Sequence, residues 1–307
     1  MCLETSTAGA SLLLREAAVP SPGAREVLVR VHAAGVTPTE IGWYPTSHQK
    51  SGEPRLHAVP GHEFSGVVAG CGGEVSEFRE GDEIYGMSDW FQDGATAEYC
   101  LTSPKCIATK PARLSHIEAA TVPIGALTAW QGLFDRARLQ KGERVLIHGG
   151  AGAVGVFAIQ LARMAGAHVI TTASVRHREF LVELGAEQVI DYRTERFEEI
   201  LRDIDVVFDG VGGEALERSW GVLKPAGRLA TIAASGEGAS ADERTKAAFF
   251  IVEPNHEQLT EIARLLENGT LRTFVDAVVP LEEASAAYFG KINRRHGYGK
   301  VVVSVME

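Results

Sequence analysis

Residues Arg144–Thr172 read RVLIHGGAGAVGVFAIQLARMAGAHVITT and carry the clearest structural signal in the sequence. Its first residues, Arg144–His148, have the length and apolar composition of a buried strand. A glycine-rich loop follows, and the apolar spacing of Ala153–Ala165 predicts a helix directly after it. A second apolar run, His168–Thr172, predicts the next strand. The stretch is therefore typical of a β-α-β unit built around a glycine loop.

Working outward from this unit, strand-like and helix-like runs continue to alternate from about residue 120 to about residue 250. This alternation predicts an α/β fold with a doubly wound parallel sheet. The first third of the chain instead carries short strand candidates among many glycines, which favours a small β barrel or sandwich. The tail returns to strands at Val275–Val279 and Lys300–Val305, and we expect it to join the β-rich first third.

Composition narrows the classes of partner. The 307 residues hold 40 Asp and Glu against 30 Lys and Arg, a formal net charge of −10, which argues against nucleic acid or an anionic membrane as the main partner. We see no secretory signal and no stretch long enough to span a membrane. The four cysteines form no Cys-x-x-Cys pair, so we expect reduced thiols and a cytoplasmic location.

The glycine loop has the spacing of a dinucleotide-binding motif. Gly150 permits the tight turn, Gly152 lets the backbone approach a pyrophosphate, and Gly155 lets the helix pack closely on the strand. The amino end of the helix also attracts an anion. We therefore expect a dinucleotide cofactor, the alternative being a glycine-rich turn that serves packing alone.

The end of the second strand indicates which dinucleotide binds. NAD sites place an Asp or Glu there, about 20 residues after the motif, to hold the ribose 2′-hydroxyl. This chain has Ser174, Arg176 and Arg178 instead. A hydroxyl and two guanidinium groups would bind a 2′-phosphate that a carboxylate would repel. The sequence thus predicts NADPH, unless the two arginines only begin a solvated helix face.

Several short motifs, in this order, resemble the zinc-free quinone oxidoreductase (zeta-crystallin-like) branch of the medium-chain dehydrogenase/reductase superfamily. Besides the glycine loop they are Val27-Leu-Val-Arg-Val31, Gly61-His-Glu-Phe-Ser-Gly66, Gly81-Asp-Glu83, Leu127-Thr-Ala-Trp130, Leu184-Gly-Ala186, Val189-Ile-Asp-Tyr192, Asp209-Gly-Val-Gly-Gly213 and Gly299-Lys-Val-Val302. The chain departs from the pattern at its start, where it enters near Ser11–Arg15 with the usual first strand shortened or missing. The segment 235–247 is also short for the superfamily.

The resemblance implies a GroES-like β-rich domain made of residues 1–120 and 254–307, with a Rossmann NADP(H)-binding domain at 121–253 inserted between them. It also implies that cofactor and substrate meet between the domains, that the protein forms a homodimer, and that hydride passes from NADPH to a quinone, enone, enal or enoyl thioester.

The zinc enzymes of the superfamily bind their metal through a Cys, a His and a second Cys. Here Thr37 stands at the first position and Ile124 falls near the last, while His62 and Glu63 remain. One imidazole and one carboxylate do not supply the three protein ligands of a catalytic zinc site. We therefore expect no metal and interpret His62 as a structural histidine.

The resemblance and the strand ends together nominate the site residues. Thr128 is expected at the nicotinamide, Gly152, Ala153 and Val154 at the pyrophosphate and ribose, and Tyr192 beside the adenosine phosphate. Further cofactor candidates are Val211 and Ala233 at strand ends, Phe250, which either covers the nicotinamide or packs in the core, and Lys300 at a phosphate. Catalytic candidates are Thr37 as a hydrogen-bond donor and Tyr44 as a proton donor; Trp43, Trp90 and Phe91 are candidates for an apolar pocket wall.

These observations predict a zinc-independent, NADPH-dependent oxidoreductase that transfers hydride to a quinone or an activated C=C bond of a small molecule. One alternative is an enoyl-thioester reductase, which would need a basic rim, for which the candidates are Lys50, Arg55, Arg294 and Arg295. The same scaffold would also suit a non-catalytic NADPH-binding protein. A zinc-type alcohol dehydrogenase is a third candidate, which Thr37 and Ile124 disfavour.

Overall fold

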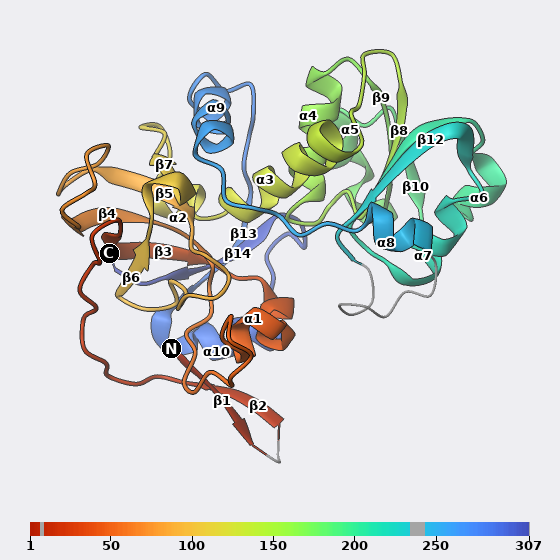
Figure 1. Ribbon diagram of the computed structural model, residues 1–307. Coiled ribbons are helices and arrows are strands. Elements are labelled where there is room, and N and C mark those ends of the chain that lie inside the picture. Colours follow the sequence, from red (N-terminus) through yellow and green to blue (C-terminus); the bar gives the residue numbers. More distant parts are fainter. Residues whose placement is uncertain (7–8, 234–242, 307) are drawn as a thin grey trace. The chain divides into compact units, whose positions relative to one another are not determined.

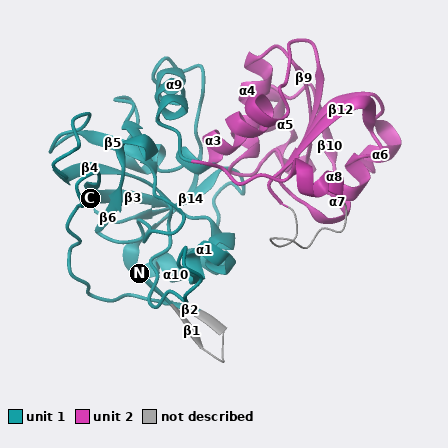
Figure 2. Cartoon of the chain, viewed as in Figure 1, with its two compact units in different colours: residues 1–124, 254–307 teal, residues 125–253 magenta. Residues whose placement is uncertain are grey.

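The computed structural model describes residues 1–6, 9–233 and 243–306 (Figure 1). The chain divides into two compact units (Figure 2). Unit 1 comprises Met1–Ile124 and Pro254–Glu307, and unit 2 comprises Gly125–Glu253. In the described part of the chain, no helix combines the length and the apolarity needed to cross a bilayer. Positions 234–242, which make up most of the segment expected to be short, lie outside the described residues.

Unit 2 is built on a five-stranded parallel sheet in the order β10-β9-β8-β11-β12. The strands are β8 (Arg144–His148), β9 (His168–Ala173), β10 (Gln188–Asp191), β11 (Ile204–Asp209) and β12 (Leu223–Thr231). The chain moves from β8 outward to β10 and then returns to the other side of β8. With right-handed crossovers, this order places helices on both faces of the sheet. The expected doubly wound α/β fold is confirmed.

The helices of unit 2 alternate with these strands. They are α4 (Gly155–Met164), α5 (Arg178–Leu184), α6 (Phe197–Ile200), α7 (Gly213–Ser219) and α8 (Glu243–Ala248), while α3 (Pro123–Trp130) begins in unit 1 and continues as a π-helix over Gln131–Arg136. A strand covered on both faces carries apolar side chains without alternation. That is why Val145–His148 of β8 are all buried.

Unit 1 carries a mixed β-sheet. Its strands are β3 (Val27–Gly35), β4 (Glu63–Cys71), β5 (Glu83–Met87), β6 (Tyr99–Thr102), β7 (Ile107–Thr109), β13 (Val275–Pro280) and β14 (Lys300–Ser304). The order is β13-β14-β3-β4-β5-β7, with β6 also paired to β3. Because β14 pairs antiparallel with β3, the carboxyl-terminal tail completes the sheet that the first third begins.

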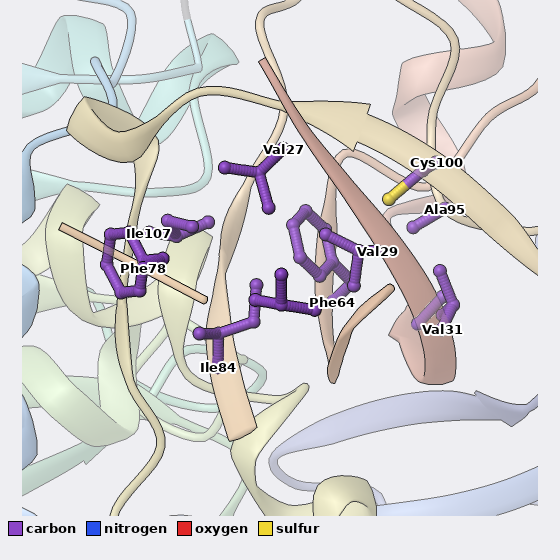
Figure 3. Packing of buried hydrophobic residues seen from close by; sticks show 11 residues of the cluster. Val27, Val29, Val31, Phe64, Phe78, Ile84, Ala95, Cys100 and Ile107 are labelled. Atoms are coloured by element: carbon purple, nitrogen blue, oxygen red, sulfur yellow. The ribbon is translucent and has the colours of Figure 1, made fainter. Parts of the chain in front are cut away.

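The core of unit 1 follows from alternation along β3. Val27, Val29 and Val31 are fully buried, whereas Arg30 between them is exposed. The valines pack with Phe64 and Ile84 and with further apolar side chains (Figure 3). Half-buried antiparallel strands produce this pattern because successive side chains point to opposite faces.

In the described part of unit 1, the sheet is accompanied by the α-helices α1 (Tyr44–Ser47), α2 (His116–Ala119), α9 (His256–Glu267) and α10 (Ala284–Tyr288). The longest, α9, begins after Asn255, whose side chain accepts a hydrogen bond from the Gln258 amide. Two polar contacts hold α9 on the sheet. The Tyr85 hydroxyl donates to the Leu259 carbonyl at 2.6 Å, and His256 Nδ1 lies 2.6 Å from the Ile107 carbonyl oxygen.

The start of the chain differs from the expectation of a shortened or missing first strand. Strands β1 (Cys2–Ser6) and β2 (Gly9–Leu13) pair antiparallel as a separate two-stranded sheet. The family motifs begin only in β3, so the resemblance carried no information about this hairpin. Met1, Leu3 and Leu12 are buried with Val303 and Tyr288 in a second apolar cluster of unit 1.

We expect Tyr85→Phe to lower the free energy of unfolding by about 1 kcal/mol, because a buried hydrogen bond is lost while the ring remains. Burial raises the pKa of Tyr85, so its hydroxyl is an uncharged donor. Urea unfolding measures the change. Tyr99→Phe, at a half-buried tyrosine on β6, is the control; equal stability of the two variants would contradict the role of the contact with Leu259.

Candidate functional site

The glycine loop between β8 and α4 has two buried glycines and one exposed glycine. A Cβ atom on Gly150 would lie 2.2 Å from Thr171 Oγ1, and one on Gly155 would lie 2.2 Å from the Gly149 carbonyl oxygen. Neither position has room for a side chain. Gly152, by contrast, is exposed, and a Cβ there would meet the Gly149 oxygen only at 3.2 Å. Gly150 and Gly155 thus serve close packing, and the turn at Gly152 presents bare backbone at the surface.

The loop leads directly into α4, which begins at Gly155. Gly152 is exposed, and Ala153 and Val154 are half-buried. The Val156 amide already bonds to the Gly152 carbonyl at 3.1 Å, so the helix winds up immediately after the turn. The first amides of a helix have no acceptor within the helix, and the helix dipole favours negative charge there. This arrangement fits the pyrophosphate of a dinucleotide, which needs close approach and amide donors.

A buried histidine fixes the strand end from which the loop departs. His148 lies 3.0 Å through Nδ1 from Thr172 Oγ1 and 2.9 Å through Nε2 from Ser219 Oγ. Burial lowers the pKa of His148 to about 4, so the ring is neutral near pH 7. The Ser219 hydroxyl donates to the Ala215 carbonyl, so it accepts from Nε2–H. The unprotonated Nδ1 then accepts from the Thr172 hydroxyl.

The carboxyl end of β9 is basic. Ser174 is buried directly after the strand, and Arg176 and Arg178 are exposed within the next four residues. The Arg176 Nε donates to His177 Nε2 at 2.9 Å, and Arg178 lies 3.7 Å from Glu195. Because β9 is the neighbour of β8 in a parallel sheet, these groups share the sheet edge with the glycine loop. The edge thus offers two guanidinium groups to an anion.

Three further cofactor candidates lie at the same edge. Tyr192 is exposed after β10, with the Arg193 guanidinium 5.6 Å from its ring. Val211 is exposed after β11, and Ala233 is half-buried after β12. Asp209, at the end of β11, shapes this edge: its carboxylate accepts from the Val211 amide at 3.1 Å and from the Thr231 hydroxyl at 2.8 Å. Asp209 is accordingly a turn-forming residue.

Two cofactor candidates of unit 2 are buried. Thr128 lies within α3 and is 2% exposed. Phe250 is 4% exposed and packs against Gly132, with the Arg136 guanidinium 5.7 Å from its ring. These neighbours from the π-helix over 131–136 favour core packing for Phe250, and its contact with the nicotinamide stays a prediction. Nothing in the sequence separates such a core aromatic from a cofactor-facing one.

Unit 1 holds a cluster of buried ionisable side chains with the half-buried Thr37 hydroxyl beside them. We call it the acid–base cluster, and its members are Thr37, Glu40, His62, Glu63 and Lys300. Glu40 lies 3.1 Å from His62 Nδ1 and accepts from the Gly61 amide at 2.5 Å. Glu63 forms an ion pair with Lys300 and accepts from the Ile124 amide at 3.0 Å. Both carboxylates are fully buried. Each negative charge is thus matched inside the unit by a basic side chain.

Lys300 differs from the expectation that it reaches a phosphate. Its side chain is 5% exposed, pairs with Glu63, and donates to Thr37 Oγ1 at 3.4 Å. Burial lowers the pKa of Lys300 to about 7, while the Glu40 carboxylate opposes the shift. The adjoining Glu63 carboxylate also favours the ammonium form. The pairing of β14 with β3, which brings Lys300 beside Thr37, could not be read from a local motif.

Sequence reasoning missed Glu40. It lies in a short 3-10 helix over Pro38–Gly42, directly after Thr37, and no pattern marks it as a buried acid. A carboxylate without any exposed surface needs a partner, and His62 supplies one. The Nε2 atom of His62 is buried and has no hydrogen-bond partner among the described residues.

Aromatic side chains lie beside this cluster. The Trp90 ring is 5.1 Å from the His62 ring and 5.2 Å from the Trp43 ring, and both tryptophans are half-buried. Tyr44 is 43% exposed and stacks on His48 at 4.3 Å. Phe91 lies apart, under Lys50, in an open depression of about 1010 Å³ on unit 1. Two of the three predicted pocket aromatics are therefore close to Glu40 and His62.

The side chains at the expected zinc position do not form a metal site. Within residues 1–6, 9–233 and 243–306, no group of three His, Cys, Asp or Glu side chains is placed to hold a metal ion. His62 and Glu63 are each engaged by a buried partner, and Thr37 contributes only a hydroxyl. The residues present do not fit the three-ligand site that catalytic zinc uses.

The pKa of His148 makes stability depend on pH. Its value falls from 6.5 in the unfolded chain to about 4 in the folded one, so only the unfolded state takes up a proton in that window. The free energy of unfolding must then fall as the pH drops from about 6.5 to about 4. His148 contributes roughly 3 kcal/mol to this fall.

We expect His148→Gln to flatten the loss of stability between pH 6.5 and pH 4, measured by urea unfolding at several pH values. His168→Gln, at an exposed histidine on β9, is the control and should leave the slope of the wild type unchanged. A slope identical in all three proteins would show that His148 is protonated without cost.

Comparison with known proteins places the chain in a family. The amino-terminal region matches the alcohol dehydrogenase GroES-like domain over residues 23–126, and residues 184–303 match the zinc-binding dehydrogenase family. A probable mitochondrial zinc-binding oxidoreductase of Arthroderma benhamiae is 33% identical, covering 96% of this chain and 94% of its own.

Two further relatives are informative. The chloroplastic NADPH-dependent alkenal/one oxidoreductase of Arabidopsis thaliana is 31% identical over 96% of this chain and 76% of its own length. The solved quinone oxidoreductase of Coxiella burnetii is 32% identical, covers 94% of this chain and 93% of its own, and superimposes with a TM-score of 0.83. The chain therefore belongs to the medium-chain dehydrogenase/reductase superfamily and is an oxidoreductase with a nicotinamide cofactor.

Proposed function

We propose that this protein is an NADPH-dependent reductase that transfers hydride to a quinone or to the activated C=C bond of an enone or enal, without zinc. The observation that carries the proposal is the acid–base cluster of unit 1. Where a zinc enzyme would gather three metal ligands, this chain pairs His62 with Glu40 and Glu63 with Lys300. The relatives named quinone oxidoreductase and alkenal/one oxidoreductase support the same substrate class.

The cofactor half of the proposal rests on the edge of unit 2. The turn at Gly152 and the amino end of α4 would hold the pyrophosphate, with Ala153 and Val154 beside it. Ser174, Arg176 and Arg178 would bind the 2′-phosphate through charge-assisted hydrogen bonds. A reduced nicotinamide bound there supplies the hydride. Thr128, Tyr192, Val211 and Ala233 stay predicted contacts.

Without a metal to polarise the substrate, the substrate itself must be electrophilic enough to accept a hydride. Zinc polarises an isolated carbonyl and lowers the pKa of an alcohol, and we find no group among the described residues that replaces it in both tasks. A conjugated acceptor spreads the charge of the added hydride over several atoms. Positioning and one hydrogen-bond donor near the carbonyl then suffice, and the Thr37 hydroxyl can provide that donor. Trp43 and Trp90 offer apolar surface to a flat, conjugated molecule.

The enoyl-thioester alternative finds less support in the described residues. It needs basic side chains free to meet a phosphorylated arm. Three of the four candidates face carboxylates: Lys50 pairs with Asp89, Arg55 with Asp93, and Arg294 with Asp276. These pairs neutralise most of the expected basic rim. Homodimer formation and a cytoplasmic location stay predictions from the sequence.

A panel of acceptors tests the activity. We expect the purified protein to oxidise NADPH, followed by absorbance at the nicotinamide band, with a quinone and with a short enone, and to leave saturated aldehydes unreduced. The rates should survive extensive chelation and dialysis. Turnover of aldehydes that is lost with the chelator and restored by zinc would favour the zinc-type alcohol dehydrogenase. Tight NADPH binding without turnover of any acceptor would favour a binding protein.

The coenzyme choice has its own test. We expect Arg176→Ala with Arg178→Ala to raise the dissociation constant for NADPH by roughly 10- to 100-fold, because charge-assisted contacts to the 2′-phosphate are lost. Binding of NADH should change little. Fluorescence titration measures both. Arg163→Ala, an exposed arginine in the last turn of α4, is the control. Equal affinities of the wild type for NADPH and NADH would contradict the assignment.

A further inference from the structure

This inference rests on the proposed function and concerns how the substrate receives its proton. We propose that Lys300 and Thr37 form a proton relay, in which the Thr37 hydroxyl protonates the reduced substrate and the Lys300 ammonium group restores the proton to Thr37. Thr37 would be the catalytic residue of this step. Lys300 and Glu63 would be positioning residues that act through it.

The relay has a direction set by its hydrogen bonds. Lys300 Nζ donates to Thr37 Oγ1 at 3.4 Å, and an ammonium group has no lone pair with which to accept. The hydrogen of the Thr37 hydroxyl is therefore not used by Lys300 and remains available to another acceptor. The side chain of Thr37 makes no capping bond to the short helix that follows it. Lys300 therefore holds the Thr37 oxygen, and the hydroxyl hydrogen can be donated to a bound substrate.

Burial leaves Thr37 as the outlet of the cluster. Lys300 is 5% exposed, and Glu63 and Glu40 have no exposed surface. Of the two side chains that Lys300 Nζ contacts in the described structure, Glu63 is enclosed and Thr37 is half-buried. A proton that leaves the ammonium group towards the surface therefore passes through the Thr37 hydroxyl.

The charged groups around Lys300 favour its ammonium form, whereas burial favours the neutral amine. Glu63 on β4 pairs with it directly, and Glu40 after β3 acts at longer range. His62, beside Glu63 in the chain, shares the charge of Glu40. Burial nevertheless brings the pKa of Lys300 down to about 7. A general acid with a pKa near the working pH transfers protons most effectively.

The step balances in atoms and charge. Hydride from the reduced nicotinamide forms a new C–H bond at the β-carbon of an enone, and the π electrons of the C=C bond move to give an enolate. The enolate takes the proton of the Thr37 hydroxyl as that O–H bond breaks. Thr37 Oγ1 then takes a proton from Lys300, and the neutral amine recovers one from water. The net change adds one hydride and one proton across the C=C bond.

Two variants test the relay. We expect Thr37→Val to lower the turnover of an enone by about 100-fold, in the range by which general acids accelerate reactions. Lys300→Met combined with Glu63→Gln removes the relay without leaving an unpaired buried charge. We expect the same loss from this pair. Reduction of a quinone should fall in both variants clearly less than reduction of an enone, because a hydroquinone anion is a far weaker base than an enolate and depends less on a proton donor.

The pH profile separates a relay from mere structural damage. With the wild type, enone turnover should fall as pH rises through about 7, because the ammonium form of Lys300 is the donor. This limb should be absent from the quinone reaction and from both variants. Thr37→Ser keeps the hydroxyl, so it should keep the enone turnover of the wild type and the fall of that turnover above about pH 7.

A matched control is available in the same unit. Lys110 is, like Lys300, a buried lysine paired with a carboxylate. It is 7% exposed, and its Nζ lies 3.3 Å from Glu83 Oε2. Lys110→Met combined with Glu83→Gln should leave the enone rate and its pH profile unchanged. An independent measurement is an NMR titration of the Lys300 side chain, followed by its ¹⁵N and ¹³C shifts in the protein without cofactor. Glu63→Gln should change the pH midpoint at which Lys300 loses its proton, and Lys110→Met should not.

The outcomes distinguish the relay from the proposed function. If the wild type reduces neither enone nor quinone, the proposed function fails and the relay fails with it. If the wild type reduces enones but Thr37→Val, or the Lys300–Glu63 pair, keeps the wild-type rate and pH limb, the relay alone is overturned. The relay is overturned as well if the wild type reduces quinones and no enone.

Discussion

Unit 2 depends on the close approach of a helix to the end of a strand. α4 can begin where β8 ends because Gly150 leaves room for Thr171 of β9 and Gly155 leaves room for the Gly149 carbonyl. Any side chain at these two positions would push the helix away from the sheet. The same approach leaves the exposed turn at Gly152 as backbone alone, so the constraint that brings helix and strand together also shapes the turn at which we propose that the pyrophosphate binds. His148 adds a second fixed point by tying the strand end to Thr172 and Ser219.

Unit 1 solves a different problem, the burial of charge. Two carboxylates without exposed surface are costly unless each has a partner, and Glu40 and Glu63 find theirs in His62 and Lys300. Removing one member of such a pair typically costs about 3–5 kcal/mol, because the other charge stays buried. A hydrophobic replacement of the pair would be less expensive, so stability alone does not account for it. The proposed relay gives these buried charges a chemical purpose.

Local patterns in the sequence predicted the parallel sheet, the glycine loop and the basic end of β9, because each is encoded by residues close together in the chain. Three features were out of reach. The hairpin of β1 and β2 lies before the first family motif. Phe250 has the same apolar character whether it packs in a core or faces a cofactor. Lys300 meets Glu63 only through the pairing of β14 with β3, and a pairing between distant segments leaves no periodic signal in either. Glu40 was missed for the same reason, since its partner lies in another element.

The construction of unit 1 from both ends of the chain has a consequence for biosynthesis. Gly35 of β3 faces Val302 of β14, so the sheet that begins with β3 is completed by a strand that is synthesised only after the whole of unit 2. Unit 2 is continuous and can fold as soon as its own residues have emerged. Until β14 has been synthesised, the part of β3 that it covers stays unpaired and Glu63 lacks Lys300, so the first part of unit 1 exposes an open strand edge during synthesis.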